Sequence, residues 1–391
     1  MKRIAIENAQ DGMILGAPIR DEFNNILLNS GVKLTANYIN KLKRMGYLQL
    51  TVGGDPDTDD IVIQDNISEE NRNMASRQVK QSFDVAEKLT AQFKNESVEN
   101  IRKNIQQPKF QKVFAKSQVF KEIQNFVKTL VEDILGNKTL SGLNSLKTHD
   151  NYTFNHSIDV TITSIFLGKQ VGMDSIQLKD LATGGLVHDI GKVFVDKSII
   201  NSSAKLTDEQ FQKMRLHPEM GYELIKNAVS TMAAQVAYQH HEKQDGTGYP
   251  RGLKGLNSIR RTGHEQHVIS LMGDVTAVAD VHDALISDRS YKKGLPPDQV
   301  IKILRNGSGI HFNREILNVF LKGIPMFPVG TGVIIGSGKY KGFIGIISFV
   351  DSGNINLPTI RVLIDDKKQR IKAFEVDMRK DPMLQVKSVP L

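Results

Sequence analysis

The chain has 391 residues, a formal charge of +8, no cysteine and no tryptophan. Without cysteine there is no disulfide, no thiolate metal site and no cysteine nucleophile, so any metal must be bound by His, Asp or Glu. The positive charge favours anionic partners, but the basic residues are dispersed and tryptophan is absent, which argues against a binding platform for long nucleic acid.

The first part of the chain, residues 1–64, is expected to form a small β-rich domain with one helix. It lacks the apolar core of a signal peptide, and no apolar run in the chain reaches the roughly 18 residues of a membrane span, so we expect a cytoplasmic protein. Apolar residues at helical spacing from Leu34 to Met45 predict the helix, which would end at Gly46. The acidic, turn-rich residues 51–60 indicate a domain boundary.

Residues 65–148 are expected to form a helical connector. Val79, Phe83 and Ala86 repeat at helical spacing, and a second helix is predicted over residues 110–135, ending at Gly136. Two interpretations stay open for this region. It is either a plain helical subdomain or a long helix that passes a signal from the N-terminal domain to the rest of the chain.

Residues 149–324 contain all ten histidines of the protein. Long apolar segments alternate with short polar loops, which predicts an all-α core. The stretch from Thr207 to Gln210 has the pattern of a capping box, and Pro218 suits the first turn of a helix, which would put His217 at the N-cap. Residues 325–391 carry β-branched runs between glycine-rich turns and are expected to form a small antiparallel β segment. The predicted fold is therefore mainly α, with small β-rich segments at both ends.

Histidines and acids recur at the apolar helical segments of this central region. One buried His alone is usually a hydrogen-bonded core residue, but a carboxylate in an apolar helix is costly unless it is paired. Several such residues from separate segments, beside a glycine-rich loop, indicate a metal site. The candidates are His156, His188, Asp189, His217, His240, His241 and Asp280.

Some neighbouring residues leave alternatives open. Asp274 and Asp283 compete with Asp280 for the last ligand position, because Asp283 lies one helical turn away on the same face. Asp245, beside Gly246, either shapes a turn or contacts a substrate. The remaining histidines are expected to be structural or exposed, namely His149, His264, His267, His282 and His311.

The motifs resemble those of the HD-GYP family, a branch of the HD phosphohydrolases, over residues 149–292. The matching stretches begin at Asp150, His188, Leu206, His240 and Ala279. The resemblance implies an HD-type helical bundle that hydrolyses cyclic di-GMP, a bacterial second messenger, to linear pGpG. The β-rich ends are similar to segments that often flank such domains, and we expect any protein partners to bind there.

The resemblance also implies which residues bind metal and substrate. One divalent ion would be held by His156, His188, Asp189 and Asp280, and a second by His217, His240 and His241, with Asp189 bridging. Asp189 and Lys192 would be catalytic, with Lys192 near the scissile phosphate, and the nucleotide would contact Gly248, Tyr249, Pro250, Arg289 and Lys292. Fe or Mn suits such nitrogen and oxygen ligands, and Ni or Zn are alternatives. Two ions ~3.5–4 Å apart can turn water into a nucleophile at neutral pH and hold a phosphoryl oxygen.

One position departs from the family pattern. Some members carry a Glu, and with it a third metal, where this chain has Tyr152, and a phenol with a pKa near 10 is a poor ligand at neutral pH. We therefore expect two metals, and further cleavage of pGpG to GMP stays open. The alternatives are a phosphodiesterase for another cyclic dinucleotide, such as 3′,3′-cyclic GMP-AMP, and a non-catalytic cyclic-dinucleotide sensor. The oligomeric state is not predicted.

Overall fold

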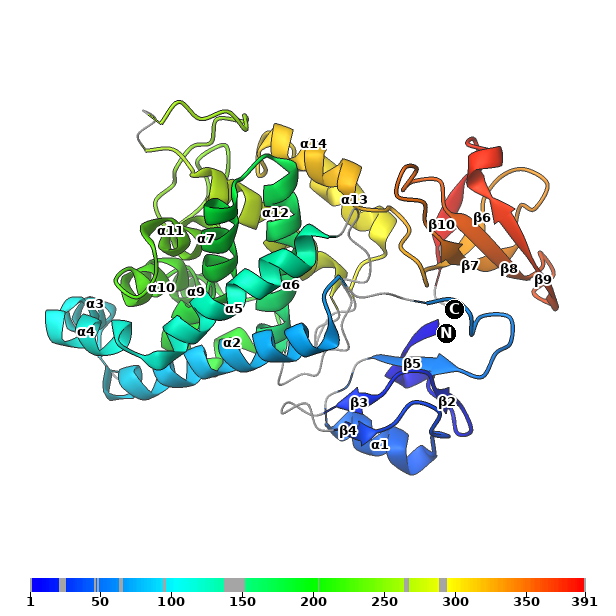
Figure 1. Cartoon of the computed structure of the whole chain (residues 1–391), viewed down its shortest axis with the longest axis horizontal. Coiled ribbons are helices and arrows are strands. Elements are labelled where there is room, and N and C mark those ends of the chain that lie inside the picture. Colours follow the sequence, from blue (N-terminus) through cyan, green and yellow to red (C-terminus); the bar gives the residue numbers. More distant parts are fainter. Residues whose placement is uncertain are drawn as a thin grey trace.

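The chain folds into a helical part and two small β units, one from each end of the sequence (Figure 1). The structure, a computed structural model, describes residues 2–20, 26–45, 47, 49–62, 66–93, 96–136, 152–202, 204–263, 267–287 and 294–389. The predicted fold class, mainly α with small β-rich segments at both ends, is confirmed. The domain boundaries at residues 64, 148 and 324 stay a prediction. No described helix combines the length and the apolar character that crossing a membrane requires.

The N-terminal unit is built from short strands around one helix. Leu15, Leu34 and Leu50 are fully buried at its centre. The N-cap of the helix is Thr35, whose side chain accepts a hydrogen bond from the Tyr38 amide. This N-cap lies one residue after Leu34, where the predicted helix began. The antiparallel sheet has the order β1-β5-β2, and β3 pairs with β4. The elements are β1 (Lys2–Ala5), η1 (Ile6–Asn8), β2 (Ile14–Leu15), β3 (Ile19–Arg20), β4 (Ile26–Leu28), α1 (Ala36–Arg44) and β5 (Gln49–Gly53).

The connector contains more helices than predicted. They are α2 (Glu69–Thr90), η2 (Ala91–Phe93), α3 (Val98–Gln106), α4 (Pro108–Ala115) and α5 (Gln118–Leu135). The single helix expected over residues 110–135 is wrong, because the chain breaks at Lys116 and Ser117. Phe114 and Phe120 lie on either side of the break with their rings 5.0 Å apart in the core. Apolar spacing alone cannot reveal such a break, since both segments present an apolar face to the same core.

The long helix α2 crosses the helical part and contacts α5 and α6 (Figure 1). An Arg72 Nη1 to Asp159 Oδ1 ion pair of 2.9 Å joins α2 to α6, and the Asp159 side chain is only 1% exposed. A buried carboxylate needs such a partner because desolvation disfavours its charge. The ion pair therefore anchors the connector on a helix of the central bundle.

The central bundle is built around α6, which packs against α7 and α12. Ile158, Ile162 and Phe166 give α6 a fully buried apolar face. The elements of the bundle are α6 (Tyr152–Gln170), α7 (Ser175–Leu186), η3 (Ile190–Phe194), α8 (Lys197–Ile200), α9 (Asp208–Met214), α10 (His217–Ile225), α11 (Thr231–Gln239), α12 (Leu271–Ile286), α13 (Pro297–Asn306) and α14 (Arg314–Gly323).

The C-terminal unit is a five-stranded antiparallel sheet in the order β10-β6-β7-β8-β9. The three predicted β-branched runs correspond to β6 (Gly332–Ile335), β7 (Ile344–Phe349) and β8 (Thr359–Ile364). The sequence did not predict β9 (Arg370–Asp377), η4 (Met378–Lys380) or β10 (Val386–Ser388). Strand β9 alternates polar and apolar residues at the sheet edge, so it lacks the continuous apolar run of a central strand.

The acidic stretch that was expected to be a boundary is bound to the C-terminal sheet. Arg370 Nη2 lies 2.5 Å from Asp55 Oδ1 and 3.0 Å from Asp57 Oδ2. Arg361 donates to the Asp57 carbonyl at 3.1 Å and also pairs with the Asp60 carboxylate. These ion pairs are partly exposed, so they orient the stretch more than they stabilise it.

An apolar contact completes this attachment. Ile61 is 2% exposed and packs with Ile346 and Leu363 of the C-terminal sheet. Burial of a large aliphatic side chain contributes about 1.5–3 kcal/mol. Ile61 therefore supplies most of the free energy that holds residues 55–61 on the sheet.

Replacing this side chain should loosen the attachment. We expect Ile61→Ala to cost about 2–5 kcal/mol at this contact and to make residues 54–62 a preferred site of limited proteolysis. The thermal unfolding of the helical part should not change. Val62→Ala is the matched control, because the neighbouring Val62 is 62% exposed. Equal cleavage rates in the wild type and Ile61→Ala would contradict the contact.

Candidate metal centre

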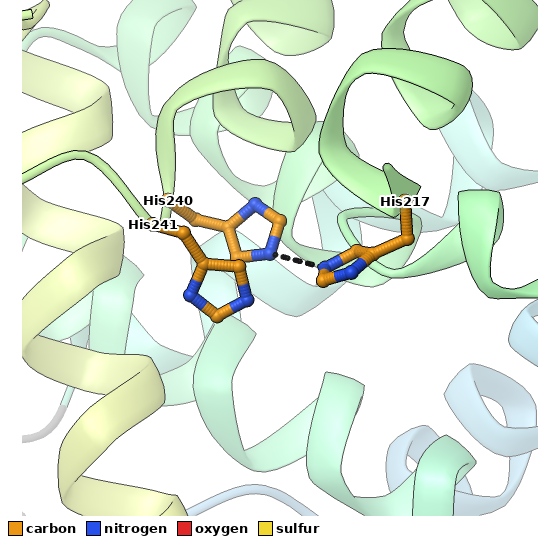
Figure 2. A group of neighbouring side chains, drawn as sticks. All are labelled: His217, His240 and His241. Atoms are coloured by element: carbon orange, nitrogen blue, oxygen red, sulfur yellow. Dashed lines mark hydrogen bonds between the residues drawn. The ribbon is translucent and has the colours of Figure 1, made fainter. Parts of the chain in front are cut away.

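The seven predicted metal ligands lie together in the interior of the helical bundle. Helix α6 contributes one of them, the segment after α7 two, the start of α10 one, the segment after α11 two, and α12 one. All but one are buried, with His241 partly exposed. Figure 2 shows three of the imidazoles facing one another. In the order of the helices the residues are His156, His188, Asp189, His217, His240, His241 and Asp280.

A close approach between two backbones brings His217 to the centre. A Cβ atom on Gly191 would lie 2.0 Å from the His217 carbonyl oxygen, so only glycine lets η3 pack against the start of α10. His217 is the first residue of α10 and Leu216 is its N-cap, so the predicted N-cap position was wrong by one residue. Pro218 lies in the first turn of α10 whether the N-cap is Leu216 or His217. Proline is tolerated there because amides of the first turn have no intrahelical acceptor, so its missing N–H costs no hydrogen bond.

Asp189 lies between two groups of imidazoles. Its Oδ1 atom is 3.4 Å from His217 Nε2 and 3.8 Å from His240 Nε2. Its Oδ2 atom is 3.5 Å from His188 Nε2 and 3.8 Å from His156 Nε2. The two carboxylate oxygens therefore face different groups of nitrogen donors, which is the arrangement of a carboxylate that bridges two cations.

A lysine accompanies this carboxylate. Lys192 Nζ lies 2.5 Å from Asp189 Oδ2, and its side chain is 21% exposed, whereas that of Asp189 is 1% exposed. Burial opposes the charge of Asp189, but Lys192 and the surrounding imidazoles hold the pKa of Asp189 well below its ordinary value. Asp189 is therefore ionised at neutral pH, and Lys192 connects it to the solvent-accessible side of the centre.

Three of the imidazoles are oriented by backbone carbonyls. Because a carbonyl can only accept, each Nδ1 carries the proton and each Nε2 presents a lone pair to the centre. Burial lowers the pKa of all three rings, that of His217 to about 3, so they are neutral at pH 7. Metal-ligating histidines are commonly held in this way. The contacts are His188 Nδ1 to Gly185 O at 2.8 Å, His217 Nδ1 to Met214 O at 2.7 Å and His240 Nδ1 to Ala237 O at 2.9 Å.

The inner nitrogens of these rings fit a metal and no other partner. His217 Nε2 and His240 Nε2 lie 3.2 Å apart (Figure 2), although both carry lone pairs and neither has a proton to donate. Within the described part of the chain, His188 Nε2 is buried without a hydrogen bond. A buried acceptor without a donor is costly. A divalent cation resolves both problems, so the residues present suit a metal bound by nitrogen and oxygen atoms.

The structure distinguishes the positions of the three aspartates that were candidates for the last ligand, Asp274, Asp280 and Asp283. Asp280 Oδ1 lies 3.1 Å from His156 Nε2, and Asp280 Oδ2 lies 3.7 Å from His241 Nδ1. Asp283 instead accepts at 2.7 Å from His156 Nδ1, the nitrogen on the far side of the ring. Burial disfavours the charge of His156, but the hydrogen bonds to Asp280 and Asp283 raise its pKa to about 9. Asp280 therefore belongs to the centre, and Asp283 orients His156.

Asp274 lies in a separate network. It accepts from Gln244 at 2.5 Å, from Arg261 at 2.6 Å and from Asn313 at 2.8 Å. Burial raises the pKa of Asp274 to about 6 in spite of these three donors. The network ties the loop after α11 to α12 and α14, and the sequence did not predict it.

A buried glutamate shapes the loop that carries Tyr249. Glu242 accepts from the amides of Arg251 and Leu253 at 2.8 and 2.9 Å. A Cβ atom on Gly248 would lie 2.4 Å from the Lys243 amide nitrogen, so only glycine fits there. The sequence analysis missed Glu242, because its neighbours from Gln239 to Asp245 are all polar and give no sign that its carboxylate is buried.

The structure places some of the predicted substrate residues but not all. The Tyr249 ring lies 4.7 Å from the His241 ring, between centroids. Asp245 accepts from the Thr247 amide at 2.9 Å and is exposed, so it shapes the turn. Arg289, Lys292, His149, His264 and the Tyr152 side chain lie outside the described residues.

Two of the remaining histidines lie elsewhere in the helical part, as expected for structural residues. His282 is buried and its ring lies edge-on to Phe320 with the centroids 5.0 Å apart. His311 stacks on Phe312 at 4.2 Å. Burial lowers the pKa of His311 to about 4, so this ring is neutral at pH 7.

The amino-acid sequence is similar to a known domain family and to several named proteins. Residues 130–316 match the HD domain family. A cyclic di-GMP phosphodiesterase of Pseudomonas aeruginosa is 34% identical over 232 residues, which are 59% of this chain and 52% of that protein. A cyclic di-GMP phosphodiesterase of Thermotoga maritima is 31% identical, over 50% of each chain. A 3′3′-cGAMP-specific phosphodiesterase of Vibrio cholerae is 30% identical, over 46% of this chain and 33% of that protein.

The chain spans about half the length of the first two relatives. The matched HD domain, residues 130–316, includes every candidate ligand. The motifs around His188 and His240 lie in the matched region, which is therefore similar to the HD domain and to proteins named cyclic di-GMP phosphodiesterases.

Proposed function

We propose that the protein is a metal-dependent phosphodiesterase that hydrolyses cyclic di-GMP to linear pGpG. The observation that carries the proposal is the position of Asp189, whose two oxygens face separate groups of imidazole nitrogens. Such a bridging carboxylate is what a two-metal phosphodiesterase needs to hold two cations close together. The names of the relatives from Pseudomonas aeruginosa and Thermotoga maritima support this substrate.

We infer that each group of ligands holds one divalent ion. His156, His188 and Asp280 offer three donor atoms within 4.8 Å of one another, and so do His217, His240 and His241. Asp189 would be the carboxylate that both groups share. Iron or manganese suits this mixture of imidazole and carboxylate, and nickel or zinc are alternatives.

The bound ions would lower the pKa of water and withdraw charge from a phosphoryl oxygen. The residues of the chain position the substrate for this chemistry. Lys192 is partly exposed beside Asp189, so its ammonium group can donate to a phosphate oxygen. The Tyr249 ring lies against the His241 ring at the edge of the ligand cluster, so Tyr249 can contact a substrate bound there. The other predicted nucleotide contacts, Gly248, Pro250, Arg289 and Lys292, stay predictions.

The second candidate is a phosphodiesterase for 3′,3′-cyclic GMP-AMP, which the Vibrio cholerae relative favours. A non-catalytic sensor is less well supported, because sensors need no metal ligands and all seven ligand positions are filled here. Product analysis with both cyclic dinucleotides discriminates between the two substrates, and it also reveals whether pGpG is cleaved on to GMP.

Removing the bridging carboxylate tests the proposed function. We expect Asp189→Ala to reduce both the metal content and the turnover of cyclic di-GMP to background. Metal analysis and product chromatography on one anaerobically purified sample measure both quantities. Asp366→Ala, which removes an exposed carboxylate from the C-terminal unit, should change neither. A metal-replete Asp189→Ala protein that keeps its turnover would overturn the mechanism.

The orienting role of Asp283 predicts a weaker effect. Asp283→Ala removes the partner of His156 Nδ1 but leaves every candidate ligand in place. Loss of such a partner weakens metal binding about 10- to 100-fold, and competition with a metal-sensitive dye measures it. Asp283→Asn keeps an acceptor oxygen and should lie between the wild type and Asp283→Ala. Metal affinity that is identical in all three proteins would show that Asp283 does not orient His156.

A further inference from the structure

Helix α9 lies beside the metal centre without being part of the core. All seven of its residues are described and none is buried. A capping box between Thr207 and Gln210 starts the helix. Its one aromatic residue, Phe211, is 44% exposed. An exposed aromatic side chain on a helix that contributes nothing to the core suggests a role in binding.

Phe211 continues an aromatic row that begins at the metal centre. The His241 and Tyr249 rings are 4.7 Å apart with an angle of 32° between their planes. The Tyr249 and Phe211 rings are 6.2 Å apart and nearly perpendicular. Phe211 is thus separated from the His241 ring by a single intervening ring, that of Tyr249. A nucleotide whose phosphate lies at the metal centre can place its base along this row.

Arg215 lies over the same row. The central carbon of its guanidinium group is 5.1 Å from the centre of the Tyr249 ring. Among the described residues, the guanidinium has neither a hydrogen bond nor an ion pair, in contrast to Arg261, which is bound to Asp274. An arginine that stacks on an aromatic face keeps its N–H groups available in its own plane. Arg215 therefore presents unused donors beside the candidate substrate site.

We propose that Phe211, Tyr249 and Arg215 bind one guanine base of the cyclic dinucleotide. The base stacks against the aromatic row, and Arg215 donates two hydrogen bonds to guanine O6 and N7. Guanine offers two acceptors at this edge, whereas adenine offers one acceptor and one donor, so the site selects guanine. This inference rests on the proposed function and adds the residues that choose the base.

The decisive variant is Arg215→Gln, because glutamine suits the N6 and N7 atoms of adenine rather than guanine. We expect kcat/KM for cyclic di-GMP to fall roughly 10- to 100-fold, mainly through KM. The value for cyclic di-AMP should stay constant or rise. Equal losses with both cyclic dinucleotides would mean that Arg215 binds a phosphate, and no loss with either would also overturn the proposal.

Phe211→Ala tests the stacking separately. Stacking depends little on the identity of the base, so the variant should raise KM for cyclic di-GMP and cyclic di-AMP by similar factors. Phe211→Trp should restore both values. Phe349→Ala, at a comparably exposed phenylalanine on the C-terminal sheet, is the matched control. An unchanged KM in Phe211→Ala, with normal metal content, would remove Phe211 from the site.

Equilibrium binding separates this proposal from the proposed function. GMP and AMP are titrated into the metal-loaded wild type and Arg215→Gln proteins, which needs no turnover. A preference for GMP that disappears in Arg215→Gln supports the base site even if cyclic di-GMP is not hydrolysed. A wild-type protein that hydrolyses cyclic di-GMP but binds GMP and AMP equally overturns the base site and leaves the proposed function intact.

Discussion

The structure depends on one buried carboxylate. Asp189 is 1% exposed, and a charge at such a position is costly unless opposite charges surround it. Lys192 supplies one of these charges, and the lone pairs of His188, His217 and His240 point toward a place where cations would supply the rest. The local backbone serves this arrangement. Gly191 allows η3 to lie against α10, which brings His217 to the side of Asp189 opposite His156.

Contacts outside the centre join the connector to the central bundle, and residues 55–61 to the C-terminal sheet. Arg72 on α2 binds Asp159, which lies one helical turn after His156 on α6, so a displacement of the connector acts on a helix that carries a candidate ligand. Residues 55–61 bind the C-terminal sheet through Arg361, Arg370 and Ile61, so the two β units are attached to each other. These contacts are a physical route by which the connector could pass a signal to the helix that carries His156. Whether a signal is passed stays a prediction.

The sequence predicted the residues of the centre better than their geometry. His188-Asp189 and His240-His241 were recognisable because acids and paired histidines are unusual at the ends of apolar helices. The separate roles of Asp280 and Asp283 were not predictable, since residues three apart share a helix face and only the position of His156 distinguishes them. The break between α4 and α5 escaped for a similar reason, because apolar periodicity continues across it. Arg215 had no signal, because nothing in its local sequence shows that it stacks on Tyr249.

The charges of the described residues indicate that bound metal would favour binding of the proposed substrate. Among the described residues, Asp189, Asp280 and Asp283 face the ammonium of Lys192 and the ring of His156, whose pKa is raised to about 9, while burial lowers the pKa of the other imidazoles. Without cations this set is negative and would repel a phosphodiester. Two divalent ions would reverse the sign, and Arg215 would extend the positive region outward along the aromatic row. The same ions that activate water would thus make the site able to bind an anionic nucleotide. Affinity for the substrate would therefore depend directly on the metal content of this centre.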